Sequence, residues 1–241
     1  MNSTNSKYNL HNIKVLYEDN HIIAINKSNN DLVQSDQTGD IALIDKVKDY
    51  LKKKYSKPGN VYLGVTHRLD RPVSGVVLFA KTSKALSRLN QLFKEKDIYK
   101  TYWAIVKNPP EQPAGILQHY LVRNRKKNKS YAYPSPQKEA KKGELSYKQV
   151  ASSNNYHLLE IQLHTGRHHQ IRSQLSKIGS PIKGDLKYGF PRSNKNGGIS
   201  LHARKISFIH PVKMEEITII AEPPEENLWQ FFLQMMKNKI S

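Results

Sequence analysis

Strand-like segments recur along this chain, and only some of them are separated by helices. Stretches that alternate between apolar and polar residues, or are wholly apolar and β-branched, predict a hairpin at 13–26 and strands at 61–66, 76–80, 99–106, 156–163, 206–209 and 217–221. The spacing of apolar residues predicts helices at 42–55, 83–94, 169–177 and from 227 onward. Because no strict strand–helix–strand repeat runs through the chain, the pattern predicts a mixed α+β fold.

The 241 residues allow one large domain or two small ones, and no internal repeat or long linker divides them. Residues 1–12 are polar and lack the apolar core of a signal peptide, so we expect a polar tail followed by a single domain over 13–241. The longest apolar stretches are too short to cross a bilayer. The lysine-rich helix at 43–55 is more typical of a core helix with a solvated back than of a membrane-surface helix. We therefore expect no membrane partner.

Positive charge dominates the composition. Lys and Arg number 39 against 20 Asp and Glu, which gives a formal net charge of +19. Such an excess favours polyanionic partners, nucleic acid above all. The chain contains no cysteine, which excludes a disulfide framework, a Cys-ligated zinc ion, an iron–sulfur cluster and a thiol nucleophile. This composition fits a reducing compartment, and we expect a cytoplasmic protein.

Much of this charge lies in residues 121–148, which we call the basic arm. Nine basic and two acidic residues give it a net charge of +7, and it also holds three tyrosines. It can be an arm that contacts phosphates and stacks on bases, or a solvated, partly flexible hairpin; its composition fits both interpretations. In the first case we expect RNA contacts from Arg123, Arg125, Lys126 and Lys127.

One carboxylate stands out among the candidates for chemistry. Asp70 lies between Arg68 and Arg71 in a loop that separates two predicted strands. Neighbouring cations favour the ionised form, which is a poor general acid but a plausible nucleophile or electrostatic stabiliser. The alternative interpretation is an ordinary turn aspartate paired with an arginine at the surface.

A second cluster lies at 163–172, where a glycine turn leads into a predicted helix. Arg167, His168 and His169 stand at the helix start, with Arg172 one turn further on. Helix starts offer N–H groups to anions, so the cluster suits phosphate contact. The histidine spacing matches no metal-binding helix motif and acidic residues are scarce nearby, so we expect no metal site.

The strand predicted at 99–106 brings together a cation and an aromatic ring. Lys100 and Tyr102 are two residues apart and therefore share a face. That face can be a stacking wall for a base, or merely a half-buried sheet surface.

Taken together, the motifs resemble the RluA family of RNA pseudouridine synthases. Each motif is weak alone, but five in the right order, spread over 13–224, are specific. They are Tyr-Glu-Asp-Asn…Ile-Asn-Lys at 17–27, His-Arg-Leu-Asp…Ser-Gly at 67–75, Lys-x-Tyr-x-Ala-x-Val at 100–106, Gly-Arg-x-His-Gln-Ile-Arg with Gly-x-Pro-Ile-x-Gly-Asp at 166–185, and Leu-His-Ala…Phe-x-His-Pro at 201–211.

The resemblance implies a mixed, mainly antiparallel sheet in two halves, with flanking helices and a central cleft. It implies isomerisation of uridine to pseudouridine in structured rRNA or tRNA, without cofactor or metal. By the same resemblance, Asp70 is the catalytic aspartate, Tyr102 stacks on the base and Arg172 pairs with Asp70. Arg68 would enter the gap left by the flipped base. Further RNA contacts are expected from His67, Arg71, Lys100, Arg167 and His168.

The chain departs from the family pattern in two places. Many members read Asn-Lys-Pro-x-Gly where residues 26–30 read Asn-Lys-Ser-Asn-Asn, which predicts a looser turn. Many also carry a small RNA-binding domain in front. The similarity here begins near residue 13, so we expect that module to be absent and the RNA to be gripped by the catalytic domain, the basic arm included.

Alternatives to the enzyme remain open at this level. A catalytically silent RNA-binding or ribosome-assembly protein could keep the same fold, although a pure binder would not need a carboxylate in a basic cleft. An N-glycosidase that releases uracil would share the base-flipping logic. The residues do not decide whether Asp70 attacks the sugar, attacks the base or removes a 2′ proton. They also do not name the target uridine, and a monomer is the simpler expectation.

Overall fold

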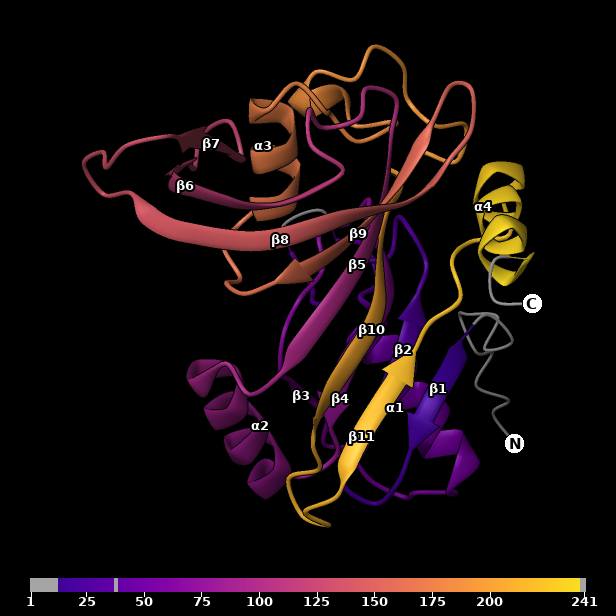
Figure 1. The fold of residues 1–241 in the computed structure, drawn as a ribbon. Coiled ribbons are helices and arrows are strands. Elements are labelled where there is room, and N and C mark those ends of the chain that lie inside the picture. The colour runs from indigo at the N-terminus through magenta and orange to yellow at the C-terminus, as the bar shows by residue number, and fades with distance from the viewer. Residues whose placement is uncertain (1–12, 37–38, 239–241) are drawn as a thin grey trace.

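The computed structural model describes residues 13–36 and 39–238 (Figure 1). Within these residues, the strands form one 11-stranded sheet with the order β1-β2-β4-β10-β5-β9-β8-β6-β7, while β11 pairs with β10 and β3 with β4. The strands are β1 (Lys14–Glu18), β2 (Ile22–Lys27), β3 (Gly64–Val65), β4 (Ser74–Ala80), β5 (Tyr99–Val106), β6 (Ala114–Asn124), β7 (Lys129–Tyr133), β8 (Lys141–Ser152), β9 (His157–Leu163), β10 (Leu201–Ile209) and β11 (Glu216–Ile220). The helices are α1 (Leu43–Lys54), α2 (Ser83–Glu95), α3 (Gln170–Lys177) and α4 (Asn227–Asn238), with a short 3-10 helix at Leu186–Tyr188.

The fully buried strand β4 carries a core on each of its faces, because successive side chains point to opposite sides of a sheet. Val77 and Phe79 pack into the cluster that includes Leu43, Val47 and Leu51 of α1. On the other face, Val76 and Leu78 pack into the cluster that includes Ala85 and Leu89 of α2. The Thr82 hydroxyl accepts a hydrogen bond from the Ala85 N–H and so caps α2.

The pairing of β4 with β10 is parallel, whereas the other strand pairs of the described sheet are antiparallel. It is short and joins Ser74 to His202 and Gly75 to Ala203. Gly75 has a φ of 116°, and a Cβ at this position would lie 2.3 Å from the Ala203 carbonyl oxygen. Only glycine therefore fits where these strands meet, which gives the Ser-Gly pair of the motif a structural cause.

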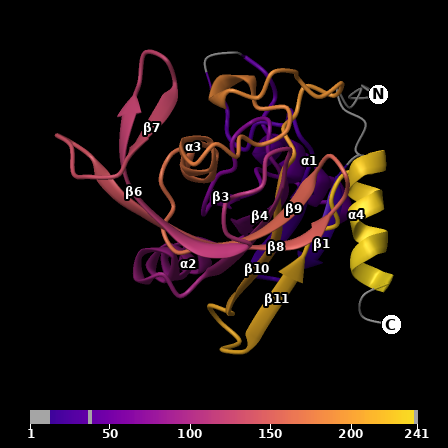
Figure 2. The same cartoon turned by 45° about the horizontal axis from the view of Figure 1, so that its top comes forward.

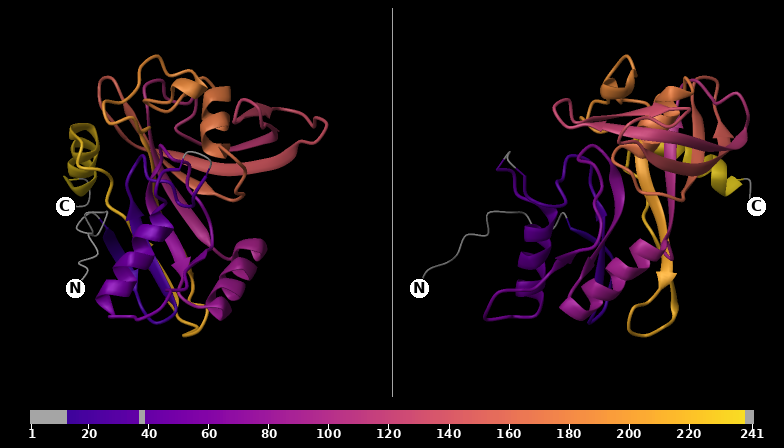
Figure 3. Two further views of the ribbon diagram at one scale, coloured as in Figure 1. Left: turned by 180° about the vertical axis from the view of Figure 1, so that it is seen from behind. Right: turned by 90° about the vertical axis from the view of Figure 1, so that its left-hand side faces the viewer.

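Strands β5, β9, β8, β6 and β7, which follow β10 in the sheet order, form the other half of the sheet. The ends of β6, β7 and β8 extend beyond the rest of the molecule, as Figures 2 and 3 show. Helix α3 packs beside β6 and β7. Helix α4 inserts Trp229 and Phe232 into a third cluster with Trp103 of β5 and Leu158 of β9. Among the described residues, no helix is long and apolar enough to span a membrane.

The predicted fold class is confirmed, with differences in individual elements. The strand expected at 61–66 is reduced to Gly64–Val65, and β10 begins at Leu201, five residues before the predicted start. The basic arm, for which a hairpin and a phosphate-contacting arm were both open, contains the end of β6, all of β7 and the start of β8, and its paired strands are part of the main sheet. The predicted tail at 1–12 lies outside the described residues.

Candidate active site

The loop that carries Asp70 is tied to the strand that follows it. The Thr66 hydroxyl donates to the Leu78 carbonyl (2.6 Å), and the Leu78 N–H donates to His67 Nε2 (3.0 Å). The Val73 N–H donates to the Asp70 carbonyl (3.0 Å), which closes a turn around the aspartate. These bonds fix the loop against β4, while 29% of the Asp70 side chain stays exposed.

Arg172, on α3, joins two carboxylates inside the molecule. Its Nε and Nη2 donate to Asp185 at 2.7 and 2.9 Å, and its Nη1 donates to Asp70 Oδ2 at 3.1 Å. Burial disfavours the charged guanidinium, but the bonds and charge of Asp185, followed by those of Asp70, outweigh it and raise the pKa of Arg172. The arginine is therefore a fixed cation that holds Asp70 in place.

The contacts to the Asp70 carboxylate converge on one of its oxygens. Arg172 Nη1 and His169 Nε2 lie 3.1 and 3.5 Å from Oδ2. Within the described part of the chain, no hydrogen bond to Oδ1 is formed. Oδ2 thus anchors the side chain, and Oδ1 can interact with a substrate.

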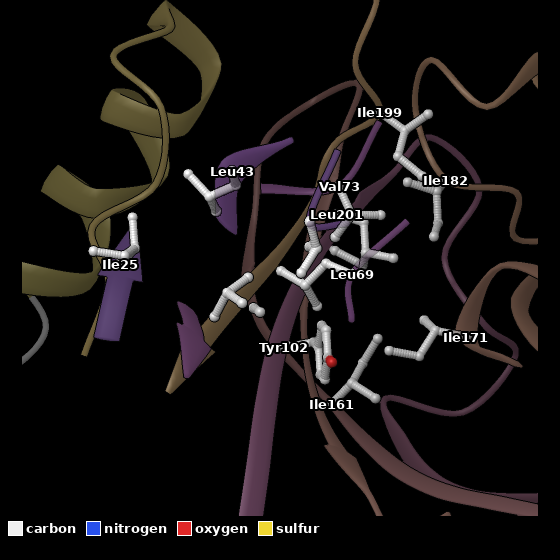
Figure 4. Close-up of a cluster of buried hydrophobic side chains, with 14 of the residues drawn as sticks. Ile25, Leu43, Leu69, Val73, Tyr102, Ile161, Ile171, Ile182, Ile199 and Leu201 are labelled. Atoms are coloured by element: carbon white, nitrogen blue, oxygen red, sulfur yellow. The ribbon is translucent and has the colours of Figure 1, made fainter. Parts of the chain in front are cut away.

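Tyr102, on β5, lies in the same core cluster as Leu69, Ile161 and Ile171, as Figure 4 shows. Only 8% of the residue is exposed. Burial, and then the negative charge of Asp70, raises the pKa of the Tyr102 hydroxyl, so the side chain is neutral at physiological pH. Its ring is therefore suited to contact a base by stacking.

The segment at 26–30 supports the same loop. The Lys27 ammonium is buried and donates to the carbonyls of Ser28 (2.8 Å) and Arg71 (3.1 Å). The Asn30 N–H donates to the same Arg71 carbonyl (2.9 Å), and Asn30 adopts a φ of 76°, which asparagine tolerates better than most residues. These hydrogen bonds tie the segment to the Asp70 loop without the proline of the family motif, and the looser turn stays a prediction.

Most of the predicted RNA-contacting residues fall into three groups. Arg68 is exposed in the loop that carries Asp70. Arg71, in contrast, forms an ion pair with Asp40 (2.7 Å). His67 and Lys100 both contact the ring of Phe93 of α2, at centroid distances of 5.1 and 5.5 Å, so they lie close together. The third group lines a pocket of ≈ 430 Å³ between the basic arm and the turn before α3; it consists of Arg123, Arg125, Arg167 and His168, and Lys141 lines the same pocket.

Lys126 and Lys127 are exposed in the turn between β6 and β7. No cluster of three or more potential metal ligands occurs in the ranges that the structure describes.

Residues that the motifs contained but to which no role was assigned complete the site. Asp185 makes the two-point contact with Arg172, and His169 approaches Asp70. The Gly-x-Pro-Ile-x-Gly-Asp motif ends at Asp185 and so held a signal. That Asp185 contacts Arg172 is not apparent from the sequence, because the spacing of residues along the chain does not reveal which side chains come together.

Known proteins resemble this chain in sequence and in fold. A family model described as RNA pseudouridylate synthase matches residues 21–177. An uncharacterized RNA pseudouridine synthase of Synechocystis is 33% identical over 88% of this chain and 66% of its own length. The ribosomal large subunit pseudouridine synthase C of Buchnera aphidicola is 33% identical over 87% of this chain and 67% of its own length. The tRNA pseudouridine synthase C of Vibrio parahaemolyticus is 29% identical over 90% of this chain and 92% of its own length.

The chain spans 58–67% of the length of several relatives, including the Synechocystis and Buchnera proteins and a tRNA pseudouridine synthase C of Pectobacterium carotovorum. Among solved structures, human RNA pseudouridylate synthase domain containing 4 shares the fold with a TM-score of 0.75, at 23% identity and 93% coverage of both chains. The motifs resembling the RluA family, the matching family model and the relatives agree. The chain therefore belongs to the RluA family of RNA pseudouridylate synthases.

Proposed function

We propose that this protein isomerises specific uridines in structured RNA to pseudouridine, with Asp70 as the catalytic aspartate. The observation that carries the proposal is the buried Arg172, which holds the partly exposed Asp70 carboxylate by one oxygen and leaves the other for the nucleoside. A carboxylate fixed in this way, below a basic surface, suits a reaction on an anionic polymer better than simple RNA binding.

Access to the uridine requires base flipping. A uracil inside folded RNA is hidden from a side chain, and extruding it costs a few kcal/mol. The exposed Arg68 stands next to Asp70 and can occupy the gap that the base leaves. Tyr102 can stack on the flipped base, and such a contact is worth about 1–3 kcal/mol.

The reaction itself adds and removes no atoms. The bond between N1 of the base and C1′ of the sugar breaks, the uracil turns, and C5 bonds to C1′. The proton on C5 leaves and N1 gains one. The Asp70 carboxylate acts on the sugar or the base through Oδ1, while Arg172, itself held by Asp185, keeps the carboxylate aimed. Because Tyr102 is neutral, we assign it to stacking rather than to proton removal.

The substrate class follows from the relatives. A protein named for tRNA and one named for the ribosomal large subunit match this chain at 29% and 33% identity. We therefore propose a uridine of tRNA or rRNA as the target. We further propose that the protein acts in the cytoplasm as a monomer.

The test uses unmodified tRNA and large-subunit rRNA transcripts that carry tritium at C5 of uridine. The wild-type protein should release tritium and form pseudouridine in one of them. Asp70→Asn should abolish release while the RNA dissociation constant changes by less than ~3-fold, because the loss is confined to the chemical step.

Each other outcome contradicts the proposal in a recognisable way. Tritium release by Asp70→Asn would remove the assignment of the catalytic residue. RNA binding without any release by the wild type would favour the silent binder, and free uracil among the products would identify an N-glycosidase. Pseudouridine mapping of RNA from cells with and without the gene then names the target position.

A further inference from the structure

His169 lies between the catalytic aspartate and the basic arm. Its Nε2 is 3.5 Å from Asp70 Oδ2, and its Nδ1 is 3.0 Å from the hydroxyl of Tyr188. That hydroxyl in turn accepts a hydrogen bond from the backbone N–H of Ser130 in β7 (2.8 Å). A chain of polar contacts thus runs from the arm to Asp70.

The hydrogen bonds assign the tautomer of this histidine. Because the Tyr188 oxygen accepts from Ser130, its own proton is available for His169 Nδ1. Nδ1 is then an acceptor, and the ring proton must sit on Nε2, which faces Asp70. Burial, followed by the nearby Arg172, lowers the pKa of His169 to about 2, so the imidazole is neutral.

The surroundings fix the ring as well as its protonation. The ring of His168 stacks on that of His169 at 3.8 Å, and the residue is only 8% exposed. His169 also has a φ of 51°, in the left-handed region that non-glycine residues adopt uncommonly. Such strain persists where the surrounding structure over-determines a residue.

We propose that His169 is a positioning residue for Asp70: its Nε2–H, oriented by Tyr188, lies 3.5 Å from Oδ2 and helps to keep the carboxylate with Oδ1 turned to the nucleoside. Unlike Arg172, it contributes a neutral donor, so it directs the carboxylate without adding charge. The inference rests on the proposed function, because it assigns a task within that reaction.

Two substitutions at this position separate a positioning role from a structural one. The amide of His169→Gln can place an N–H near the position of Nε2, whereas that of His169→Asn reaches only to the position of Nδ1. Asparagine, however, suits the left-handed backbone better than glutamine. A structural role therefore predicts that Asn is the better replacement, and a positioning role predicts that Gln is.

The experiment measures single-turnover rate, KM and melting temperature on the tritiated transcripts used above. We expect His169→Asn to lower the rate ~10-fold or more with KM within ~2-fold, since displacing a reacting group by about 1 Å can cost ~100-fold. His169→Gln should retain most of the rate. His157→Asn, on β9 and bonded to the Ser152 hydroxyl, is the matched control and should behave as wild type.

Tyr188→Phe provides a second variant that leaves His169 in place. It removes the hydroxyl that orients Nδ1 of His169. We expect its single-turnover rate to be lower than that of His169→Gln and higher than that of His169→Asn.

The outcomes distinguish this inference from the proposed function. If Asp70→Asn is inactive but His169→Asn and Tyr188→Phe react at the wild-type rate, the positioning role is wrong and the proposed function stands. A His169→Asn variant that outperforms His169→Gln would also overturn it. Activity in Asp70→Asn would overturn the proposed function itself.

Discussion

Two buried cations hold the loop of Asp70 by different chemistry. Arg172 is paired with two carboxylates and stays charged. Lys27 donates instead to the carbonyls of Ser28 and Arg71. These dipoles compensate the charge of Lys27 less well than two carboxylates compensate that of Arg172. Burial lowers the pKa of Lys27 to about 7, although the charges of Asp31 and Asp70 act in the opposite direction.

This lowered pKa predicts how stability depends on pH. Above pH 7 the folded protein has begun to lose the Lys27 proton, while the unfolded chain keeps it up to about pH 10.5. The unfolded state then binds more protons, so the contribution of Lys27 to stability rises with pH. Relative to Lys27→Met, the wild type should gain up to about 1.4 kcal/mol per pH unit between pH 7 and 9. Urea denaturation at several pH values measures this difference, and parallel curves for the two proteins would refute it.

The motifs were sufficient to predict Asp70, Tyr102 and Arg172 as a set, since each stands at a matching position. They did not reveal that Asp185 contacts Arg172 or that His169 approaches Asp70. Contacts of that kind depend on how α3 packs against the loop before β4. Spacing in the sequence carries no signal for them.

At the scale of elements, the parallel contact between β4 and β10 is the tightest constraint near the site. Gly75 sits in this contact with a φ of 116° and the Ala203 carbonyl in the way of any side chain. Asp70 lies only a few residues upstream, so a shift of β4 away from β10 would move the loop. The geometry of the sheet and that of the carboxylate are therefore linked.

Gly75→Ala tests this link. The methyl group would meet backbone on β10 and force an unfavourable φ, so we expect a loss of about 3 kcal/mol in the free energy of unfolding. Single-turnover activity should fall as well, because the loop would move. Gly59→Ala is the matched control: a Cβ at Gly59 meets nothing within 4 Å, and its stability should stay within about 0.5 kcal/mol of wild type. Equal stability of the two variants, measured by denaturation, would contradict the prediction.

Elements with a clear apolar period were predictable, and those without one were not. The buried strand β4 and the helices α1 and α2 show the expected patterns, and their cores form as those patterns require. Strands β6 and β8 carry polar residues on both faces where they extend beyond the body of the sheet. Their alternation is hidden in the sequence, and the partners that define them lie far along the chain.

At the scale of the whole molecule, the two halves of the sheet meet at the reacting group. Asp70 comes from the loop before β4 in one half, and Arg172 comes from α3 beside β6 and β7 in the other. The basic arm belongs to this second half and shares a pocket with Arg167 and His168. RNA bound along the arm is thus held by the part of the protein that also anchors Asp70.

The arm can be tested through the salt dependence of RNA binding. Each phosphate contact that is lost lowers the slope of log K against log salt by roughly 0.7–0.9. Replacing four of the exposed cations of the arm with glutamine should therefore weaken binding and flatten the slope by up to ~4; these four are Arg123, Arg125, Lys126 and Lys127.

The control removes the same charge from exposed lysines of α1 and α2, namely Lys52, Lys53, Lys84 and Lys94. If the net charge of +19 acted only as a diffuse attraction, both quadruple variants would lose affinity equally. A local contact surface predicts that only the arm variant changes its slope, while its rate at saturating RNA stays close to wild type because Asp70 and its partners are intact. A slope that is the same in wild type and arm variant would show that the RNA is held elsewhere.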